Sequence, residues 1–277
     1  MAEPVYTPII AVAKALFRAL GIRFTVSGED HVPRSGGAVM AINHVGYLDF
    51  LFAGLGAQES GRLVRFMAKK EVFDHPVGGL LMRGMRHIPV DRLGAANESY
   101  RLAVAALVRG EIIGVFPEAT ISESYELKEF KTGAARMAME AGVPLLPCVV
   151  WGSQRIFTKG RRYDLTRGTP VRIAVGEPFT PQPGSDPVIA TKELKTRMQV
   201  LLDEARSSYA GTPRSPEDTW WLPRSLGGTA PTIEEAAVRN AQRLEERAAQ
   251  GAAQAAAGGP SSRRLVRRGR VRGAARR

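Results

Sequence analysis

The chain has 277 residues, 44% of them hydrophobic and 24% charged, which suits one α/β domain with appendages and excludes a chain too polar to bury a core. Eight of the twelve net positive charges lie in the last fifteen residues, RRLVRRGRVRGAARR, so the body is only mildly basic. The single cysteine, Cys148, lies in an apolar run. We therefore expect a buried, inert thiol in a reducing compartment, without a disulfide.

Neither end of the sequence indicates a membrane span or a secretory leader. Glu3 occupies the place where a secretory signal carries positive charge, and no stretch of about 20 residues is apolar and free of charge. The longest apolar stretch, residues 38–57, contains His44 and Asp49. We therefore interpret it as a strand, a turn and a helix.

Residues 1–21 are expected to form an amphipathic N-terminal helix. In TPIIAVAKALFRAL, residues 7–20, bulky apolar residues recur at helical spacing, while Lys14 and Arg18 lie on another face. This pattern fits a helix lying in a bilayer interface. It fits a helix docked on its own domain equally well.

Residues 22–210 show short β-rich runs alternating with helical patterns. The expected strands span residues 22–26, 38–42, 63–68, 87–90, 112–116, 145–150 and 171–175. The expected helices span residues 49–56, 95–109, 133–141 and 187–207. This alternation predicts a single α/β domain with a mixed, largely parallel sheet flanked by helices.

Residues 211–250 differ in composition from the residues before them. A segment rich in turn formers carries Trp220 and Trp221, which either pack on the domain as an ordered strap or anchor it at an interface. A charged helix is expected from Thr232 to residue 250. Residues 251–277 are rich in Ala, Gly and then Arg, which predicts a disordered basic tail. Such a tail would bind a polyanion, either anionic lipid or nucleic acid, or would only solubilise the chain.

The stretch INHVGYLDF, residues 42–50, places Asn43, His44 and Asp49 in an apolar setting, where unpaired polar groups cost about 1–3 kcal/mol each. A carboxylate at position 49 can accept a hydrogen bond from one ring nitrogen of His44 and leave the other free to take a proton. Alternatively, Asp49 caps a helix and His44 is a satisfied turn residue. The other three histidines are expected to be structural or exposed: His31, His75 and His87.

The sequence offers the His–Asp pair no protein nucleophile. There is no G-x-S-x-G elbow, and Cys148 is expected to be buried, so the nucleophile would be a hydroxyl on the substrate. We expect no metal site, because the histidines and acids lack ligand-like clustering beyond this pair.

Polar residues also follow three other expected strands. They are Lys69 and Lys70 after strand 63–68, Asp91 and Arg92 after strand 87–90, and Glu118 and Thr120 after strand 112–116. If these strands share an edge with strand 38–42, the polar groups converge with His44 on one cleft.

The chain resembles the glycerolipid acyltransferase family, whose best-known members are the 1-acylglycerol-3-phosphate acyltransferases, over roughly residues 36–180. Four motifs match in order and spacing. The matching residues are, in order, Asn43-His44-x4-Asp49, Lys69, Val90-Asp91-Arg92, Phe116-Pro117-Glu118 and Val143-Pro144-Leu145-Leu146-Pro147.

The resemblance implies direct acyl transfer from acyl-CoA or acyl carrier protein, as co-substrate and without a cofactor, to the hydroxyl of 1-acylglycerol-3-phosphate, giving phosphatidic acid. It implies that His44 is the general base and that Asp49 orients it. It assigns the acceptor and its phosphate to Lys69, with Arg92, Glu118 and Thr120 as further candidates. The positive charges of Lys69 and Arg92 suit a phosphate, whereas Glu118 is better suited to orient the base or a glycerol hydroxyl.

The third motif departs from the family, which usually has Gly and Arg where this chain has Ala119 and Ile121. Isoleucine cannot bind phosphate, so the role of the arginine is missing or taken elsewhere, with Arg136 as one possible substitute. Ala119 adds a side chain that alters the local turn. Another lysophospholipid or hydroxylated lipid is therefore an alternative acceptor.

The expected location is the cytoplasmic face of the cell membrane, with the protein attached peripherally or monotopically to an anionic surface. A basic protein that binds membranes or nucleic acid without catalysis is the alternative from another class. We do not expect nucleic acid as a partner, because the tail arginines have no interleaved aromatic residues.

Overall fold

The computed structural model describes residues 3–91 and 96–257. The chain forms two compact units, one that ends at Ile233 and a second that begins at Glu234. The second unit contains helix α8 (Ile233–Ala257), which runs past the end expected at residue 250. The remainder of the expected basic tail, residues 258–277, lies outside the described residues.

The first unit is built on a seven-stranded sheet with the order β1-β7-β6-β2-β5-β3-β4. Its strands are β1 (Arg23–Ser27), β2 (Ala38–Ile42), β3 (Val64–Lys69), β4 (Ile88–Val90), β5 (Ile112–Val115), β6 (Leu145–Trp151) and β7 (Pro170–Val175). All neighbouring strands are parallel except β6 and β7, which pair antiparallel. The predicted mixed, largely parallel sheet is confirmed.

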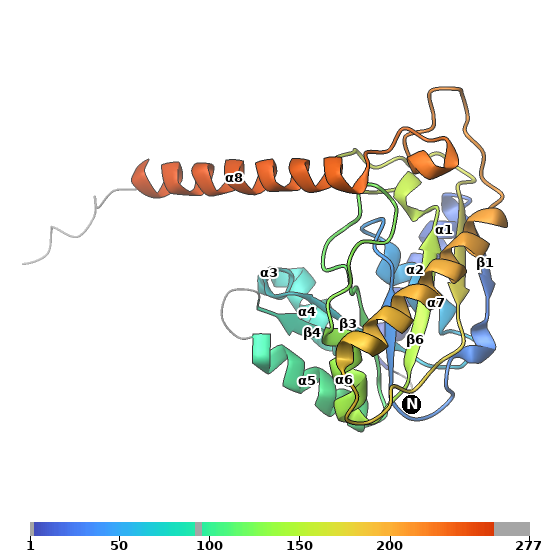
Figure 1. Ribbon diagram of the computed structural model, residues 1–277, viewed down its shortest axis with the longest axis vertical. Helices are drawn as coiled ribbons and strands as arrows, with labels where there is room; N and C mark the ends of the chain where they lie inside the picture. The colour runs from blue at the N-terminus through green and yellow to red at the C-terminus, as the bar shows by residue number, and fades with distance from the viewer. Residues whose placement is uncertain (1–2, 92–95, 258–277) are drawn as a thin grey trace, which may run out of the picture. The chain divides into compact units, whose positions relative to one another are not determined.

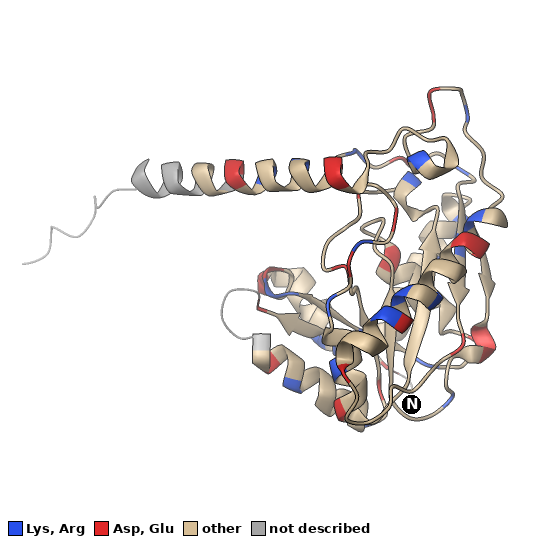
Figure 2. Ribbon diagram, in the orientation of Figure 1, with Lys and Arg blue, Asp and Glu red and all other residues tan. Residues whose placement is uncertain are grey.

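Helices cover both faces of this sheet (Figure 1). One buried cluster joins the sheet to α5 (Ala96–Val108), α6 (Gly133–Ala141) and α7 (Pro187–Ser207). A second cluster joins the opposite face to α1 (Tyr6–Ala19) and α2 (Asp49–Gly56). Residues of both charge signs lie along α7 (Figure 2). The expected α/β architecture, a sheet flanked by helices, follows from these two apolar interfaces.

Helix α1 packs on the domain through one of its faces. The Tyr6 hydroxyl donates a hydrogen bond to the Val64 carbonyl at 2.7 Å, and the Phe17 ring stacks on Phe52 with centroids 4.9 Å apart. Val12 and Leu16 remain exposed. Within the described residues, no helix combines the length and the apolar character that crossing a membrane requires.

The segment between β3 and β4 forms two helices that the sequence pattern did not predict, α3 (Lys70–Asp74) and α4 (Pro76–Gly84). His75, expected in a loop, caps α4 by accepting a hydrogen bond from the Gly78 N–H at 3.1 Å. A Cβ at Gly79 would lie 1.9 Å from the Phe73 carbonyl oxygen, so this residue has to be glycine for α3 and α4 to meet. Pro76, Gly78 and Gly79 are typical of a turn, so the sequence pattern did not indicate α4.

The Trp pair belongs to a strap packed on the domain. The side chain of Trp221 is buried, with the Arg155 guanidinium carbon 4.2 Å from its ring centroid. The ring of Trp220 carries the Arg161 guanidinium carbon at 3.9 Å. Of the two alternatives for this pair, the packed strap is the one that the structure contains.

Candidate active site

The carboxyl ends of β2, β5, β3 and β4 lie at one edge of the sheet, because these four strands are parallel neighbours. His44 follows β2, Lys69 ends β3 and Glu118 follows β5. Asp91 follows β4, whereas Arg92 lies outside the described residues. The strand order therefore brings the expected polar residues to a common edge.

His44 and Asp49 form a hydrogen-bonded pair at this edge. His44 Nδ1 lies 3.0 Å from Asp49 Oδ2. An ionised carboxylate can only accept, so Nδ1 carries the proton and Nε2 is the basic nitrogen. The His44 side chain is 19% exposed and Asp49 is fully buried. Among the residues that the structure describes, none forms a hydrogen bond with Nε2, so the ring keeps a basic nitrogen beside a buried acid.

Asp49 does not cap its own helix, although it is the first residue of α2. Its Oδ2 atom also accepts the N–H groups of Val45, at 2.7 Å, and Gly46, at 2.8 Å. The carboxylate thus holds the turn that carries His44 as well as the His44 ring. The predicted hydrogen bond between His44 and Asp49 is present, and the helix cap of the alternative is not found at the start of α2.

Ser153 is a member of this network that the sequence analysis missed. Its hydroxyl donates a short hydrogen bond to Asp49 Oδ1, and its own backbone follows β6 at the same edge. A Cβ on Gly46 would lie 3.0 Å from the Ser153 hydroxyl oxygen. The usable sequence signal was the same as for His44, because Ser153 is polar and follows a fully buried strand.

Glu118 contacts the main chain around the site. One carboxylate oxygen accepts the His44 N–H at 2.9 Å, and the other accepts the Lys128 N–H at 3.2 Å. Burial raises the pKa of Glu118 to about 6, while these two backbone hydrogen bonds act in the opposite direction. Phe116 stacks on the His44 ring with centroids 4.1 Å apart. Both residues therefore support the position of His44.

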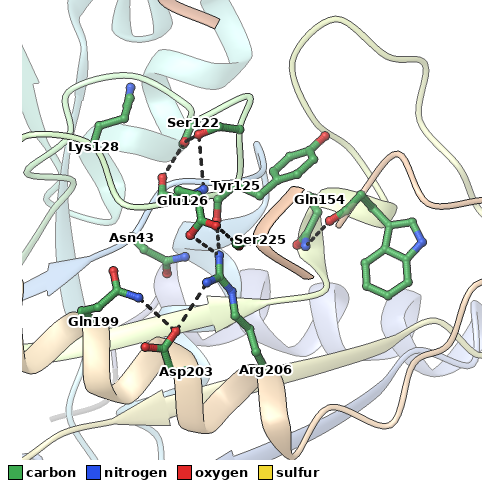
Figure 3. Close-up of polar contacts among 12 residues, drawn as sticks. Asn43, Ser122, Tyr125, Glu126, Lys128, Gln154, Gln199, Asp203, Arg206 and Ser225 are labelled. Carbon is green, nitrogen blue, oxygen red and sulfur yellow. Dashed lines mark hydrogen bonds and ion pairs between the residues drawn. The ribbon is translucent and has the colours of Figure 1, made fainter. Parts of the chain in front are cut away.

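A loop after β5 carries Thr120 and Lys128. The ammonium group of Lys128 donates to the Thr120 carbonyl at 2.5 Å and to its hydroxyl at 2.6 Å. Arg206 of α7 holds the far side of the loop by donating to the Tyr125 carbonyl, at 2.7 Å, and to Glu126, at 2.9 Å (Figure 3). The ammonium group of Lys128 points away from this Arg206 network.

Three other motif residues have structural roles. The Asn43 side chain bridges β2 to β6 by donating to the Val150 carbonyl at 3.0 Å and accepting the Val150 N–H at 2.7 Å. The Pro117 carbonyl accepts the Lys131 N–H at 2.9 Å. Pro144 lies at the opposite edge of the sheet, where its carbonyl accepts a hydrogen bond near the start of β2. The structure therefore separates Pro144 from His44.

The departures in the third motif are visible in the structure. Ala119 adopts a left-handed conformation with φ of 62°, a region that favours glycine, so the side chain at this position is accommodated in a strained turn. Ile121 is buried in the interior. The guanidinium carbon of Arg136, the suggested substitute, lies 5.3 Å from the Tyr100 ring centroid between α5 and α6. Arg136 is thus engaged by α5.

An apolar cavity of about 400 Å³ lies beneath α1. Its walls come from α1, α2, β3 and α4 and include Phe17, Phe50, Leu55, Phe66 and Met82. Phe50 follows Asp49 directly in sequence. The volume falls in the range typical of small-molecule sites.

Cys148 is buried in β6, as predicted. Burial raises the pKa of its thiol to about 12, and the charge of Asp49 contributes in the same direction. The thiol is therefore protonated at neutral pH and unsuited to act as a nucleophile.

Comparisons with known proteins agree with these features. A sequence model of the Acyltransferase family matches residues 23–151. The 1-acyl-sn-glycerol-3-phosphate acyltransferase of Bacillus subtilis (strain 168) is 30% identical over 173 residues, which cover 60% of this chain and 80% of that protein. The 1-acyl-sn-glycerol-3-phosphate acyltransferase alpha of Bos taurus is 32% identical over 195 residues, covering 69% of this chain and 67% of that protein.

Two further comparisons concern coverage and fold. An uncharacterised Mycobacterium tuberculosis protein is 31% identical over 147 residues, and the chain spans 39% of its length. The crystal structure of the 1-acyl-sn-glycerophosphate (LPA) acyltransferase PlsC from Thermotoga maritima matches with a TM-score of 0.58 and 23% identity. The match covers 74% of this chain and 80% of that one, and shows a shared fold.

The α/β sheet and its polar edge define an enzyme of the acyltransferase class. This chain belongs to the glycerolipid acyltransferase family and is an acyltransferase of the 1-acylglycerol-3-phosphate acyltransferase type.

Proposed function

We propose that this enzyme transfers a fatty acyl group from acyl-CoA or acyl carrier protein to the free hydroxyl of 1-acylglycerol-3-phosphate, giving phosphatidic acid. The observation that carries the proposal is the hydrogen bond between His44 Nδ1 and the buried Asp49 carboxylate. The names of the Bacillus subtilis and Bos taurus relatives support the choice of acceptor.

In this proposal, His44 Nε2 takes the proton of the acceptor hydroxyl as its oxygen attacks the thioester carbonyl carbon. The new C–O bond forms, the C–S bond breaks, and the leaving thiolate receives the proton back from His44. Asp49 stabilises the imidazolium between these two steps. The enzyme needs no nucleophile of its own in this scheme, and no metal or cofactor takes part.

The apolar cavity beneath α1 is proposed to receive an acyl chain. Its lining gains from burying hydrocarbon, at about 0.8 kcal/mol for each methylene. The exposed Val12 and Leu16 on the outer side of α1 would enter the interface of an anionic membrane, where lipid substrates reside. We propose peripheral attachment at the cytoplasmic membrane surface on these grounds.

We also propose a second class of acceptor, because position 121 holds a buried isoleucine where the family has an arginine. In that version the same His–Asp pair acylates another lysophospholipid or a neutral hydroxylated lipid.

The test is thiol release from a long-chain acyl-CoA in detergent micelles, with 1-acylglycerol-3-phosphate, lysophosphatidylglycerol and monoacylglycerol as separate acceptors. We expect His44→Ala to lower kcat at least about 1000-fold, because a general base and the proton return are both lost. His75→Asn, which removes an exposed imidazole but keeps a side-chain acceptor for the start of α4, is the control and should keep its activity. Appreciable turnover by His44→Ala would refute the base assignment, and turnover only with the other acceptors would establish the second class.

A further inference from the structure

The third motif lacks a cation where the family places one. Ile121 is only 5% exposed and packs in the interior. Acceptor selection through phosphate therefore requires a positive group from another position on the same edge, in addition to Lys69 at the end of β3.

Most candidate cations already have a partner. They are Lys70, which is 3.5 Å from Asp91; Lys159, which is 3.1 Å from Glu123; Arg206, which is 2.9 Å from Glu126; and Arg136, whose guanidinium carbon lies 5.3 Å from the Tyr100 ring centroid. A cation that already faces a carboxylate gains less from a second anion.

Lys128 differs from these cations in its partners. Its ammonium group donates only to neutral oxygens of Thr120, the carbonyl at 2.5 Å and the hydroxyl at 2.6 Å. Within the described residues it forms no ion pair. Thr120 is exposed, so both groups are within reach of a ligand.

Lys128 is also tied closely to the base. The carboxylate of Glu118 accepts the main-chain N–H of His44 with one oxygen and that of Lys128 with the other. One buried side chain therefore fixes the spacing between the base and the loop that carries the ammonium group. The Arg206 network holds the other side of the same loop (Figure 3).

The surroundings of Lys128 favour an incoming anion. Half-burial lowers the pKa of the ammonium group, the charge of Glu118 raises it and that of Lys159 lowers it again. Removing water from a cation strengthens its attraction to a ligand charge. A phosphate there would also receive the Thr120 hydroxyl hydrogen bond.

We propose that Lys128 and the Thr120 hydroxyl bind the phosphate of the acceptor, replacing the arginine that is absent at position 121. The inference rests on the proposed acyl transfer to a lipid hydroxyl and commits it to an acceptor with a phosphomonoester. A lysine contributes a point charge where an arginine would contribute a bidentate fork, so the phosphate is held by charge and by the hydroxyl together.

The first experiment compares Lys128→Met and Lys128→Arg in the full chain, in detergent micelles with a long-chain acyl-CoA. We expect Lys128→Met to raise KM for 1-acylglycerol-3-phosphate roughly 10- to 100-fold, the usual size of a hydrogen bond to a charged group. KM for acyl-CoA should change by less than about twofold. Lys128→Arg should restore most of the loss.

Lys192→Met is the matched control, because it removes one exposed positive charge from α7. Thermal unfolding of each variant separates a folding defect from a binding defect. An unchanged KM for 1-acylglycerol-3-phosphate in folded Lys128→Met would overturn the inference and leave the acyl transfer standing.

A binding measurement keeps the inference testable apart from turnover. Calorimetry with a short-chain, water-soluble 1-acylglycerol-3-phosphate is done on His44→Ala and on the double variant with Lys128→Met. We expect His44→Ala to bind this lipid and the double variant to bind it at least about tenfold more weakly. Equal binding by both would overturn the role of Lys128, whereas a wild type that turns over none of the acceptors would overturn the proposed function.

Discussion

Asp49 is held by four donors, and each of them comes from a different residue. They are the His44 ring, the Val45 and Gly46 N–H groups and the Ser153 hydroxyl. A carboxylate with this many partners has one orientation, and it passes that orientation on to the imidazole ring. Ser153 is therefore a positioning residue that acts on His44 through Asp49.

Ser153→Ala tests this role. Removing the hydroxyl leaves Asp49 Oδ1 without this donor and loosens the carboxylate, so we expect kcat to fall roughly tenfold, with KM for both substrates nearly unchanged. The pH profile of kcat should shift, because a looser carboxylate stabilises the imidazolium less well. Ser185→Ala, at a partly exposed loop serine, is the control. A fall in kcat without any change in the pH profile would contradict positioning through Asp49.

At the scale of single residues, the sequence predicts contacts between residues that lie close together along the chain. His44 and Asp49 were identified because five residues separate them and both follow an apolar strand. Ser153 and Glu118 reach the same turn from residues 104 and 74 positions away. Their contacts depend on β6 and β5 both lying beside β2, which a local pattern does not contain.

Among the elements, β3 and β4 are tied to α1 through a buried histidine. His87 Nδ1 accepts the Phe66 N–H at 3.0 Å, and its ring lies edge-on to Tyr6 with centroids 5.7 Å apart. Burial, followed by the nearby charge of Arg65, lowers the pKa of His87 from 6.5 to about 4. The folded state therefore holds this imidazole neutral, and its protonation favours unfolding.

Because the unfolded histidine takes up a proton near pH 6.5 and the folded one near pH 4, stability from His87 is complete above pH 6.5 and is lost as the pH falls toward 4. Between pH 7 and pH 5 this loss is about 2 kcal/mol. His87→Gln keeps an acceptor for Phe66 but does not titrate. Urea unfolding gives the free energy of unfolding at pH 7 and at pH 5. Its decrease between these two pH values should be smaller by about 2 kcal/mol in His87→Gln than in the wild type. Parallel decreases in both proteins would contradict the assignment.

Strands were easier to predict than short helices. All seven strands were expected within two residues of their observed limits, because buried β-branched runs bounded by turn residues are a strong local signal. The helices α3 and α4 were missed because Pro76, Gly78 and Gly79 indicate a turn when neighbouring structure is ignored. The packing of α3 on β3 and β4, and of α4 on α3, overrides that local preference.

At the scale of the whole molecule, the sheet and its strap are one unit and α8 lies in another. A chain ending at Ile233 should therefore keep its unfolding temperature within about 2 °C and its activity on detergent-dispersed substrate. A chain ending at Gln250 should behave in the same way. Loss of activity in detergent by either protein would show that the sheet unit depends on the removed residues.

The same truncations locate membrane attachment. The removed segment contains the eight arginines of the last fifteen residues, which would attract anionic lipid. We expect both truncated proteins to bind phosphatidylglycerol vesicles more weakly than the full chain at low salt, with the difference shrinking as salt is added. Equal binding by all three would assign attachment to α1 alone.

The pairing of the first strand with the last has a consequence for synthesis on the ribosome. Arg23 of β1 pairs with Pro170 of β7, and β7 is also the strand that joins β1 to β6. At translation speeds of about 5–20 residues per second, β1 waits on the order of ten seconds for its partner. During that time its edge is open to other chains, so we expect nascent chains released before residue 170 to aggregate while the completed sheet stays soluble.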